Sequence, residues 1–450
     1  MHDEEVHGPA SKFWNRRKIL LIFLGPPVLI VIGVLIFLAA YDEKLQPFED
    51  LVPETRPMAG PERNGFVFLI SKWDERPSVP YKVREAWHKF AGRNGPWEDV
   101  FADIFNPKHQ EFRRDLADAL ALPEWRDPGW LVTDEEGAWS SKRWEDGPLP
   151  ALESEAWMKA KTGDLEYAVS LISDMRRMAR RQIQGSREAG SVTRGLAWDR
   201  TMAEFTCLVV AQFQPNDNLL AGLSEIWRMD PIFTEDLVEP IRNSCVQFRH
   251  QFDDEEMMDR ISWPARVFLL KRNKTVNLHH REMRTLMADG LRTGPHGLAY
   301  ESDHFSGDEW RPGLKTADNL VGVWMARDGI RITGSQLNDS GRDQLFKSRA
   351  LRVWLAIRRW QLLHPSQKLA SLAELPPDLQ NSIPSDPWDG QPLRWHAADQ
   401  LITGLGSDWK EGPATFRALT WFNLDPASPA LRLVLPPLPV PAVRTPKPTR

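Results

Sequence analysis

The stretch Ile19–Ala40, ILLIFLGPPVLIVIGVLIFLAA, decides how the rest of the chain is organised. It contains no charged residue, and a helix of this length extends roughly 33 Å, enough to cross the hydrocarbon core of a bilayer. No polar face interrupts the run, as one would in a helix of a soluble domain. Gly25-Pro26-Pro27 lies near one end, where freed backbone groups reach the interface. The sequence therefore predicts a single transmembrane helix.

The flanking charges predict the orientation of this helix. Arg16-Arg17-Lys18 precedes it and Asp42-Glu43 follows it, so the positive-inside rule makes residues 1–18 a cytoplasmic tail. Residues 41–450 are then periplasmic or otherwise extracytoplasmic, and the protein belongs to the cytoplasmic (inner) membrane. The alternative is a cleaved signal peptide. The apolar run is longer than a signal-peptide core, however, and Phe37–Tyr41 lacks an A-x-A cleavage pattern.

The composition excludes two classes of protein. The chain has 57 Lys and Arg against 62 Asp and Glu, a formal net charge of −5, so no nucleic-acid partner is expected. Only two cysteines occur, which excludes a disulfide scaffold. Both lie in stretches with a helical pattern, where Cys207 and Cys245 are predicted to be buried thiols or a disulfide between neighbouring helices. The 20 Trp against 4 Tyr indicate core packing or, alternatively, a stacking surface.

The fold class predicted is mainly α, with an N-terminal transmembrane helix, a domain of antiparallel helical hairpins and a small C-terminal antiparallel β element. Apolar residues recur at helical spacing through the middle of the chain, separated by short connectors. The predicted segments are a cytoplasmic tail (1–18), the anchor (19–40), a Pro-rich stalk (41–80), a helical domain (81–342), a helix with a small sheet (343–425) and a Pro-rich tail (426–450). The apolar run Phe66–Ile70 within the stalk is expected to dock onto the helical domain.

One predicted hairpin has specific end signals. Thr162-Gly163-Asp164 is expected to end one helix and to cap the next, which spans Leu165–Ile183. The apolar stripe of this second helix predicts its buried face, and its basic residues Arg176, Arg177, Arg180 and Arg181 suit the negative end of the helix dipole. The other helices are expected at about 81–91, 108–120, 149–160, 198–213, 218–227, 234–252, 277–291 and 343–363.

The C-terminal segment contains the most distinctive sequence. A long helix is followed by Ser371-Leu-Ala-Glu-Leu375, by IPSDPWDGQPLRW at 383–395 and by Gly404-Leu-Gly-Ser-Asp408. The Asp389-Gly390 turn and the apolar Leu401-Ile402 predict a small antiparallel sheet. This order resembles the C-terminal half of the major pseudopilin of type II secretion, a family with a short sheet and a calcium-associated Ser-x-Gly-x-Asp-Gly turn.

The chain also resembles large, uncharacterised membrane-anchored proteins of planctomycete and verrucomicrobial type. Gly163–Ala168 (GDLEYA) and Asn273–Asn277 (NKTVN) fit that pattern, which implies no known activity. Two features depart from pseudopilins. The residues before the anchor lack a Gly-Phe-Thr-Leu-Ile-Glu processing site, and Trp409 replaces a glycine of the calcium turn. Asp408 is thus the candidate ligand for calcium, with a turn-forming Asp as the alternative.

No motif in the sequence carries catalysis. His279-His280 with Glu282 is the densest histidine site, but adjacent helical residues point about 100° apart and neither H-E-x-x-H nor H-x-x-E-H occurs, so a structural role is expected. A loop holding His296, Asp303, His304 and Asp308 is a weaker metal or acid–base candidate. No nucleophile elbow, Walker A or dinucleotide fingerprint is found. No catalytic or cofactor-binding residue is therefore predicted.

The sequence predicts a single-pass membrane-anchored envelope protein with a structural or protein-interaction role. Its partners would be the membrane, through Ile19–Ala40, and a protein of the cell envelope. One alternative is an envelope hydrolase with an acidic, Trp-lined cleft, which two close carboxylates in a deep pocket would favour. The other is a divergent pseudopilin-like secretion component.

Overall fold

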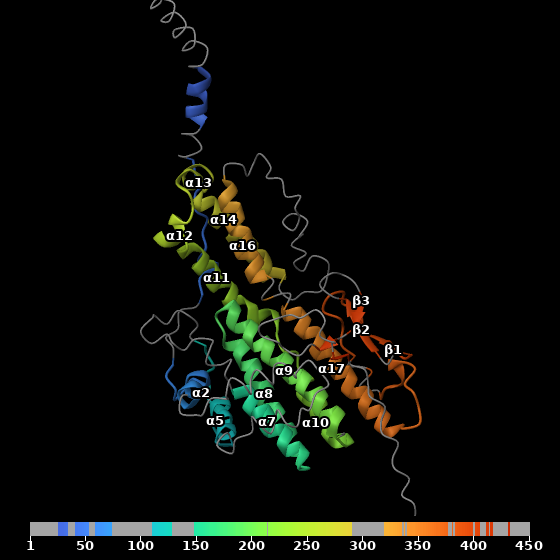
Figure 1. Cartoon of the computed structure of the whole chain (residues 1–450). Coiled ribbons are helices and arrows are strands. Elements are labelled where there is room, and N and C mark those ends of the chain that lie inside the picture. Colours follow the sequence, from blue (N-terminus) through green and yellow to red (C-terminus); the bar gives the residue numbers. More distant parts are fainter. Residues whose placement is uncertain are drawn as a thin grey trace, which may run out of the picture. The chain divides into compact units, whose positions relative to one another are not determined.

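The computed structural model is mainly helical and divides into two compact units, each built from segments far apart in sequence (Figure 1). Unit 1 comprises 1–52, 245–284 and 303–331, and unit 2 the remainder. The sequence predicted continuous segments instead. The structure describes residues 26–34, 41–53, 59–73, 110–127, 148–213, 215–289, 319–334, 337, 340–376, 380, 383–398, 401–405, 411–413, 415–416 and 431–432.

Unit 2 is a packed set of helices with a small sheet. Short connectors place α7, α8 and α9 side by side, α10 packs on α8, and α17 returns from far along the chain to pack on α9 and α10. The helices are α2 (Gly65–Trp73), α5 (Gln110–Ala121), α7 (Pro148–Lys161), α8 (Leu165–Gly185), α9 (Ala189–Phe213), α10 (Asp217–Ile226), the start of α11 (Val238–His250) and α17 (Ser340–Leu363), with 3-10 turns η4 (Thr234–Leu237) and η7 (Leu372–Glu374).

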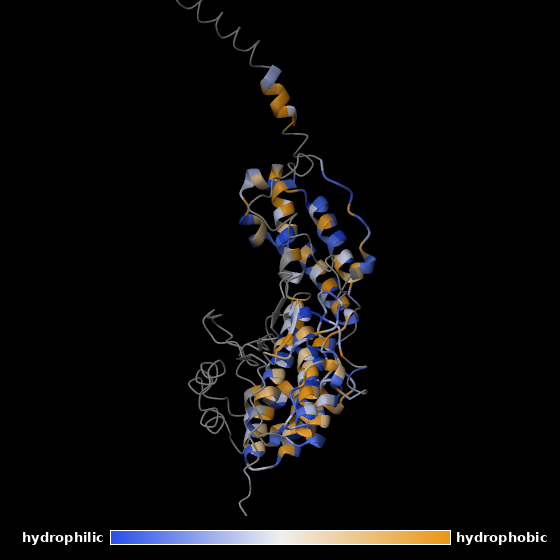
Figure 2. Ribbon diagram, turned by 90° about the vertical axis from the view of Figure 1, so that its right-hand side faces the viewer, coloured by the Kyte–Doolittle hydropathy of each residue, from blue (hydrophilic) through white to orange (hydrophobic). Residues whose placement is uncertain are grey.

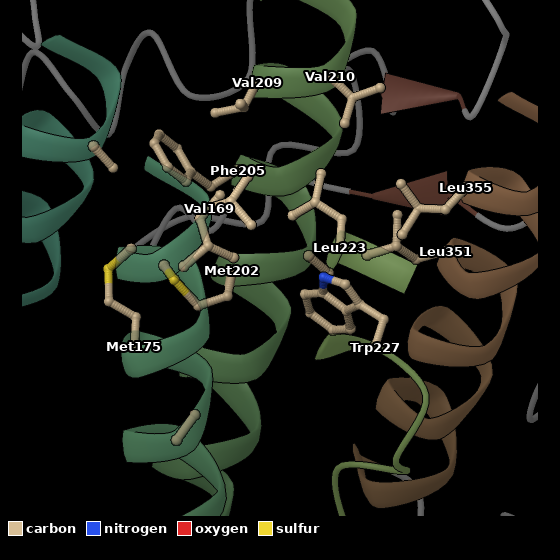
Figure 3. Packing of buried hydrophobic residues seen from close by; sticks show 14 of the residues in the cluster. Val169, Met175, Met202, Phe205, Val209, Val210, Leu223, Trp227, Leu351 and Leu355 are labelled. Atoms are coloured by element: carbon tan, nitrogen blue, oxygen red, sulfur yellow. The ribbon is translucent and has the colours of Figure 1, made fainter. Parts of the chain in front are cut away.

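The apolar stripe of α8 forms the centre of unit 2. Its predicted buried face is confirmed, since Ala168, Val169, Ile172, Met175 and Ala179 are all buried. This face meets α7, α9 and α10. Figure 3 shows side chains of α8, α9, α10 and α17 converging in one apolar cluster, which includes Val169, Met175, Met202, Phe205, Leu223, Trp227, Leu351 and Leu355.

The start of α8 has the cap that the sequence predicted. Gly163 has a φ of 91°, which ends the preceding helix, and the Asp164 carboxylate accepts the N–H of Tyr167 at 3.2 Å. Asp164→Ala leaves this N–H without its acceptor and is expected to lower the free energy of unfolding by about 1 kcal/mol. Urea unfolding measures the loss. Asp164→Asn keeps an acceptor and should retain most of the stability, and equal losses in the two variants would contradict the capping role.

The segment predicted as a stalk is partly helical. Its apolar run docks as expected, because Phe66, Leu69 and Ile70 on α2 are buried in the main core cluster of unit 2. α2 packs on α5. The turn before it is fixed by the buried Asn64, whose side chain accepts the N–H of Arg126 at 3.0 Å. A docked helix replaces the extended stalk here because its apolar face needs a partner.

The small C-terminal sheet is confirmed. Strands β1 (Arg394–His396), β2 (Leu401–Leu405) and β3 (Glu411–Pro413) form an antiparallel sheet, and β4 (Thr415–Phe416) pairs with β5 (Leu431–Arg432). Asp386, from the IPSDPW motif, is fully buried and accepts the N–H groups of Trp388 at 2.8 Å and Leu405 at 2.6 Å. The motif thus joins the Asp-Gly turn to β2.

Unit 1 contains the later part of α11, α12 (Glu255–Asp259), α13 (Trp263–Phe268), most of α14 (Arg272–Asp289) and most of α16 (Leu320–Gly334), with the 3-10 turn η1 (Glu49–Leu51). The predicted helix at about 277–291 begins earlier, at Arg272. The acidic run at 253–256 heads α12, as the helix dipole favours, whereas α13 was not predicted because its six residues carry too short a pattern.

Residues 42–50 run along α14 from its first turn toward its last. The Asp42 carboxylate accepts the N–H groups of Asn273 at 3.0 Å and Lys274 at 3.2 Å, and so caps the helix. Further along, the N–H of Gln46 donates to Asn277 at 2.8 Å. At the far end Arg284 forms two hydrogen bonds with Asp50, of 2.7 and 2.8 Å. The segment after the predicted anchor is therefore bound and not a free linker.

Of the predicted anchor, only residues 26–34 belong to the described part of the chain. They form a helix whose apolar side chains are exposed, among them Leu29 at 68% and Ile30 at 65%, and which is mostly orange in Figure 2. Among the described residues, no helix combines the length and the apolar character needed to cross a membrane. The predicted helix at 81–91, the loop at 293–318 and the C-terminal tail lie outside those residues, β5 excepted.

Candidate metal centre

Unit 1 brings one cysteine and two histidines together in its interior. Cys245 lies on α11, while His279 and His280 are neighbours on α14, and all three side chains are at most 1% exposed. The cysteine sulfur and one nitrogen of each ring lie within 4.8 Å of one another. Thiol and imidazole are the side chains that zinc and copper prefer, whereas calcium takes oxygen ligands.

The helical periods explain how these residues become buried. On α14, His279 shares an apolar face with Val276, Met283 and Leu286, all of which are buried. On α11, Cys245 shares a buried face with Ile241 and Phe248. Residues three and four apart on a helix lie on one side of it. His279 thus occupies a core position that an apolar residue would normally fill.

The expectation that the two histidines diverge is wrong for their ring nitrogens. Adjacent residues do leave a helix in different directions. An imidazole nevertheless reaches far enough from the backbone that both rings approach Cys245, with their centroids 6.1 Å apart and their planes at 64°. The direction in which each side chain leaves the helix does not by itself decide where its ring nitrogens lie, because the length of the side chain matters as well.

Aromatic rings surround the two imidazoles. His279 stacks on Phe248, with ring centroids 3.9 Å apart and planes at 6°. His280 lies 5.7 Å from the ring of Phe48, which belongs to the segment bound along α14. On α16, a Cβ at Gly329 would lie 3.4 Å from the His279 ring and 3.1 Å from Phe248. The glycine lets α16 approach the site closely, so the cluster is enclosed on several sides.

The histidine nitrogens lack good hydrogen bonds. Both nitrogens of His279 and both of His280 are buried without a hydrogen-bond partner among the described residues. The backbone of Cys245 lies close enough to His280 to favour its charged form. Buried polar atoms are nearly always satisfied in proteins, and each exception needs an explanation such as a bound ion or water. The two nitrogens of His279, which have no partner among the described residues, indicate that the site is built to hold something.

Burial sets the charge state of all three groups. It lowers the pKa of His279 to about 3 and that of His280 to about 4, and it raises the pKa of Cys245 to about 12. At neutral pH the imidazoles are therefore neutral, the form that binds metals. Arg284 opposes the effect of burial on the thiol. This arginine comes from another helix, α14, so the sequence around Cys245 does not show it.

The other predicted site residues lie elsewhere. Glu282, next to the histidine pair, forms an ion pair of 3.0 Å with the exposed Arg281. Cys207 and Cys245 are both free thiols, and Cys207 lies in unit 2. Asp408, the candidate calcium ligand, lies outside the described residues, as do His296, Asp303, His304 and Asp308. Calcium at Asp408 therefore stays a prediction.

A second group of buried ionisable residues lies in unit 2. Glu153 on α7 is 1% exposed, and burial together with the charge of Glu204 on α9 raises the pKa of its carboxyl well above the usual range. Burial also raises the pKa of Glu204 to about 8, although Arg200 and Lys347 oppose this. Burial therefore favours the neutral form of Glu153, and Glu204 is mostly protonated at neutral pH.

These carboxyls make a prediction about stability and pH. Between pH 4.5, the ordinary pKa, and about 8, native Glu204 keeps a proton that the unfolded chain releases. The free energy of unfolding should therefore fall as the pH rises through this window, by up to about 1.4 kcal/mol per pH unit from this group. Glu204→Gln stays neutral and should flatten the dependence. Urea unfolding at pH 5 to 8 measures it, with the exposed Glu225→Gln as control, and equal slopes in all three proteins would contradict the assignment.

Comparison with known proteins adds no relative: no family model, no curated protein and no solved structure matches this chain. The arguments about function therefore rest on the residues described above.

Proposed function

We propose that this chain is a single-pass protein of the cytoplasmic membrane, with residues 41–450 outside the cytoplasm in a structural or protein-interaction role. The observation that carries this is the helix at 26–34, whose large apolar side chains are 45–68% exposed. Six exposed apolar residues within positions 28–34 are unfavourable in water and favourable in lipid. The uncharged sequence extends on both sides of this helix to Ile19 and Ala40.

The bound segment after the anchor gives unit 1 a membrane-facing end. Asp42 caps α14 and follows Ala40 by two residues, which span at most about 7 Å. The start of α16 lies at the same end, because the N–H of Val321 donates to the Leu269 carbonyl at 2.9 Å. Trp263 on α13 and Trp324 on α16 are each 64% exposed. Tryptophan favours the boundary between lipid and water, so these side chains suit that position.

The interaction role is supported by an exposed patch on unit 2. Met229 is 54% and Phe233 is 38% exposed, and Arg180 lies over the Phe233 ring at 5.5 Å and near the Met229 sulfur at 3.1 Å. Methionine, aromatic residues and arginine are enriched in the contact regions of protein interfaces. The hydrolase alternative has less support than the interaction role, because Glu153 is buried between packed helices and not on a surface that a substrate reaches.

The anchoring test compares two substitutions within the described helix. Ile30→Arg places a charge near the middle of the span, where insertion becomes less favourable by about 2.5–3.5 kcal/mol. Gly33→Ala is the matched control, because a Cβ there has nothing within 4 Å. After alkaline extraction, wild type and Gly33→Ala should stay in the membrane pellet, and Ile30→Arg should shift to the supernatant. Recovery of the wild type in the supernatant would overturn the proposal.

Topology and processing are measured in the same preparation. Protease added to spheroplasts should digest residues 41–450 and leave a small membrane-protected fragment. The intact mass of the purified protein should retain residues 1–40. A mass lacking these residues would show a cleaved signal peptide and overturn the anchor, whereas protection of the whole chain would reverse the orientation.

For the interaction role, crosslinking in native membranes should give a defined adduct that Met229→Asp removes and Glu225→Gln leaves. An adduct unchanged by Met229→Asp would overturn the role of this patch.

A further inference from the structure

We propose that Cys245, His279 and His280 bind a transition-metal ion of the zinc class, which ties α11 to α14 inside unit 1. Three observations support this assignment: the convergence of the three side chains, the lack of a hydrogen-bond partner for the His279 ring among the described residues, and the type of the donor atoms. The site is independent of the membrane anchor.

The geometry is close to that of a loaded site. Zinc bonds of about 2.3 Å to sulfur and 2.0–2.1 Å to nitrogen place neighbouring tetrahedral ligands roughly 3.3–3.6 Å apart. The three donor atoms lie within 4.8 Å of one another. Inward side-chain rotations that shorten the longest separation by about 1 Å would bring them to ligand distance. The backbones of α11 and α14 need not move for this.

The orphaned nitrogens distinguish this cluster from ordinary packing. A buried imidazole without partners is destabilising relative to a satisfied one, and an apolar residue would fit the same core positions without that cost. A metal bound by one nitrogen of each ring removes part of this cost. Both nitrogens of His279 are buried without a partner among the described residues, and Phe248 holds the ring by stacking.

Loading the site releases a proton. Binding requires the Cys245 thiolate, and a coordinating thiol gives up its proton to solvent as the metal–sulfur bond forms. Three protein ligands leave one position of a tetrahedral ion for water. The buried setting favours a structural role for the ion.

The experiment uses the full chain purified in detergent under reducing conditions. Its zinc content is measured after metal-free dialysis and addition of one equivalent of Zn²⁺, with removal of unbound ion. Wild type should retain about one zinc per chain, and Cys245→Ser and His279→Gln should each lose it. Loss of a ligand should weaken binding by more than the roughly 10–100-fold that loss of an outer partner costs. Cys207→Ser and His250→Gln are matched controls from outside the cluster and should bind like wild type.

A second measurement does not depend on the variants folding correctly. Co²⁺ added to the wild-type protein should produce a thiolate-to-cobalt charge-transfer band and the visible absorption of a tetrahedral site, and Zn²⁺ should displace both. Wild-type protein with native circular dichroism but no metal and no such spectrum would overturn the proposal and leave buried water as the occupant. Metal retained equally by Cys245→Ser, or lost equally from Cys207→Ser, would also overturn it.

Discussion

Asp199→Ala is expected to lower the free energy of unfolding of unit 2 by about 3–5 kcal/mol. Asp199 on α9 is fully buried and pairs with the guanidinium of Arg176 on α8 at 3.1 Å, where Arg176 is 2% exposed. The same carboxylate accepts hydrogen bonds from Gln344 at 2.7 Å and Ser348 at 3.0 Å on α17. Removing it leaves a buried positive charge and two buried polar groups without their acceptor.

The effect extends to the end of α10. Arg176 also donates to the backbone carbonyls of Ile226 and, at 2.6 Å, Met229, and it lies 4.0 Å from the centroid of the Trp227 ring. One arginine thus joins α8, α9 and the loop after α10. Loss of Asp199 should therefore also increase amide exchange in this loop.

Guanidinium unfolding measures the stability loss, and hydrogen exchange measures the loop. Asp199→Asn keeps part of the hydrogen bonding but not the charge, so it should fall between wild type and alanine. Glu225→Ala is the control, because it breaks an ion pair with Arg228 in which both side chains are about 70% exposed. It should lower the free energy of unfolding by at most about 1 kcal/mol. If Asp199→Ala costs no more than this control, the buried network does not stabilise the unit.

Gly185→Ala is the second substitution with a large expected effect. Gly185 is the last residue of α8, and a Cβ built there lies 1.6 Å from the carbonyl oxygen of Trp125 and 2.7 Å from its carbonyl carbon. Because the obstacle is backbone, no side-chain rotation relieves it. Overpacking of a core usually costs about 1–3 kcal/mol, and a contact this short should reach or exceed the upper end.

The displaced segment has its own attachments. The Trp125 indole donates to Gln182 at 3.1 Å, and Gln182 in turn donates to Asp127 at 2.8 Å, so a shift of Trp125 disturbs both bonds. Gly190→Ala, near the start of α9, is the control. A Cβ there meets nothing within 4 Å, so the variant should be neutral or more stable by up to about 1 kcal/mol. Thermal unfolding compares the two variants, and equal midpoints would show that the Trp125 backbone does not pack against α8 as described.

The parts of the fold that depend on local sequence were predictable. The 3.6-residue period identified α8 and its buried face, and Gly163-Asp164 marked its start. The Asp-Gly turn marked the small sheet. Helix starts were less accurate: α9 begins at Ala189 and not near 198, because Gly190 and Gly195 weaken the helical pattern there.

Features that depend on distant partners were not predictable. Arg176 was assigned to the helix dipole along with Arg177, Arg180 and Arg181, but its charge is neutralised by Asp199 on another helix. This correction needs the packing of α8 on α9. Cys245 and the two histidines similarly carry no spacing that resembles a metal motif, since two helices separated by α12 and α13 supply them. The helical period does predict that His279 falls on an apolar face.

The attachment of residues 42–50 along α14 sets an order of assembly during synthesis. Asp42 and its partner Asn273 are separated by 231 positions in the chain. The helix that Asp42 caps, α14, has therefore not yet been synthesised when residues 42–50 leave the ribosome. At a synthesis rate of about 5–20 residues per second, the wait is roughly 10–50 s. During that time α2 to α10, which lie between the two partners in the chain, are already complete. Unit 1 therefore closes around a segment that was made first, after much of unit 2 has been synthesised.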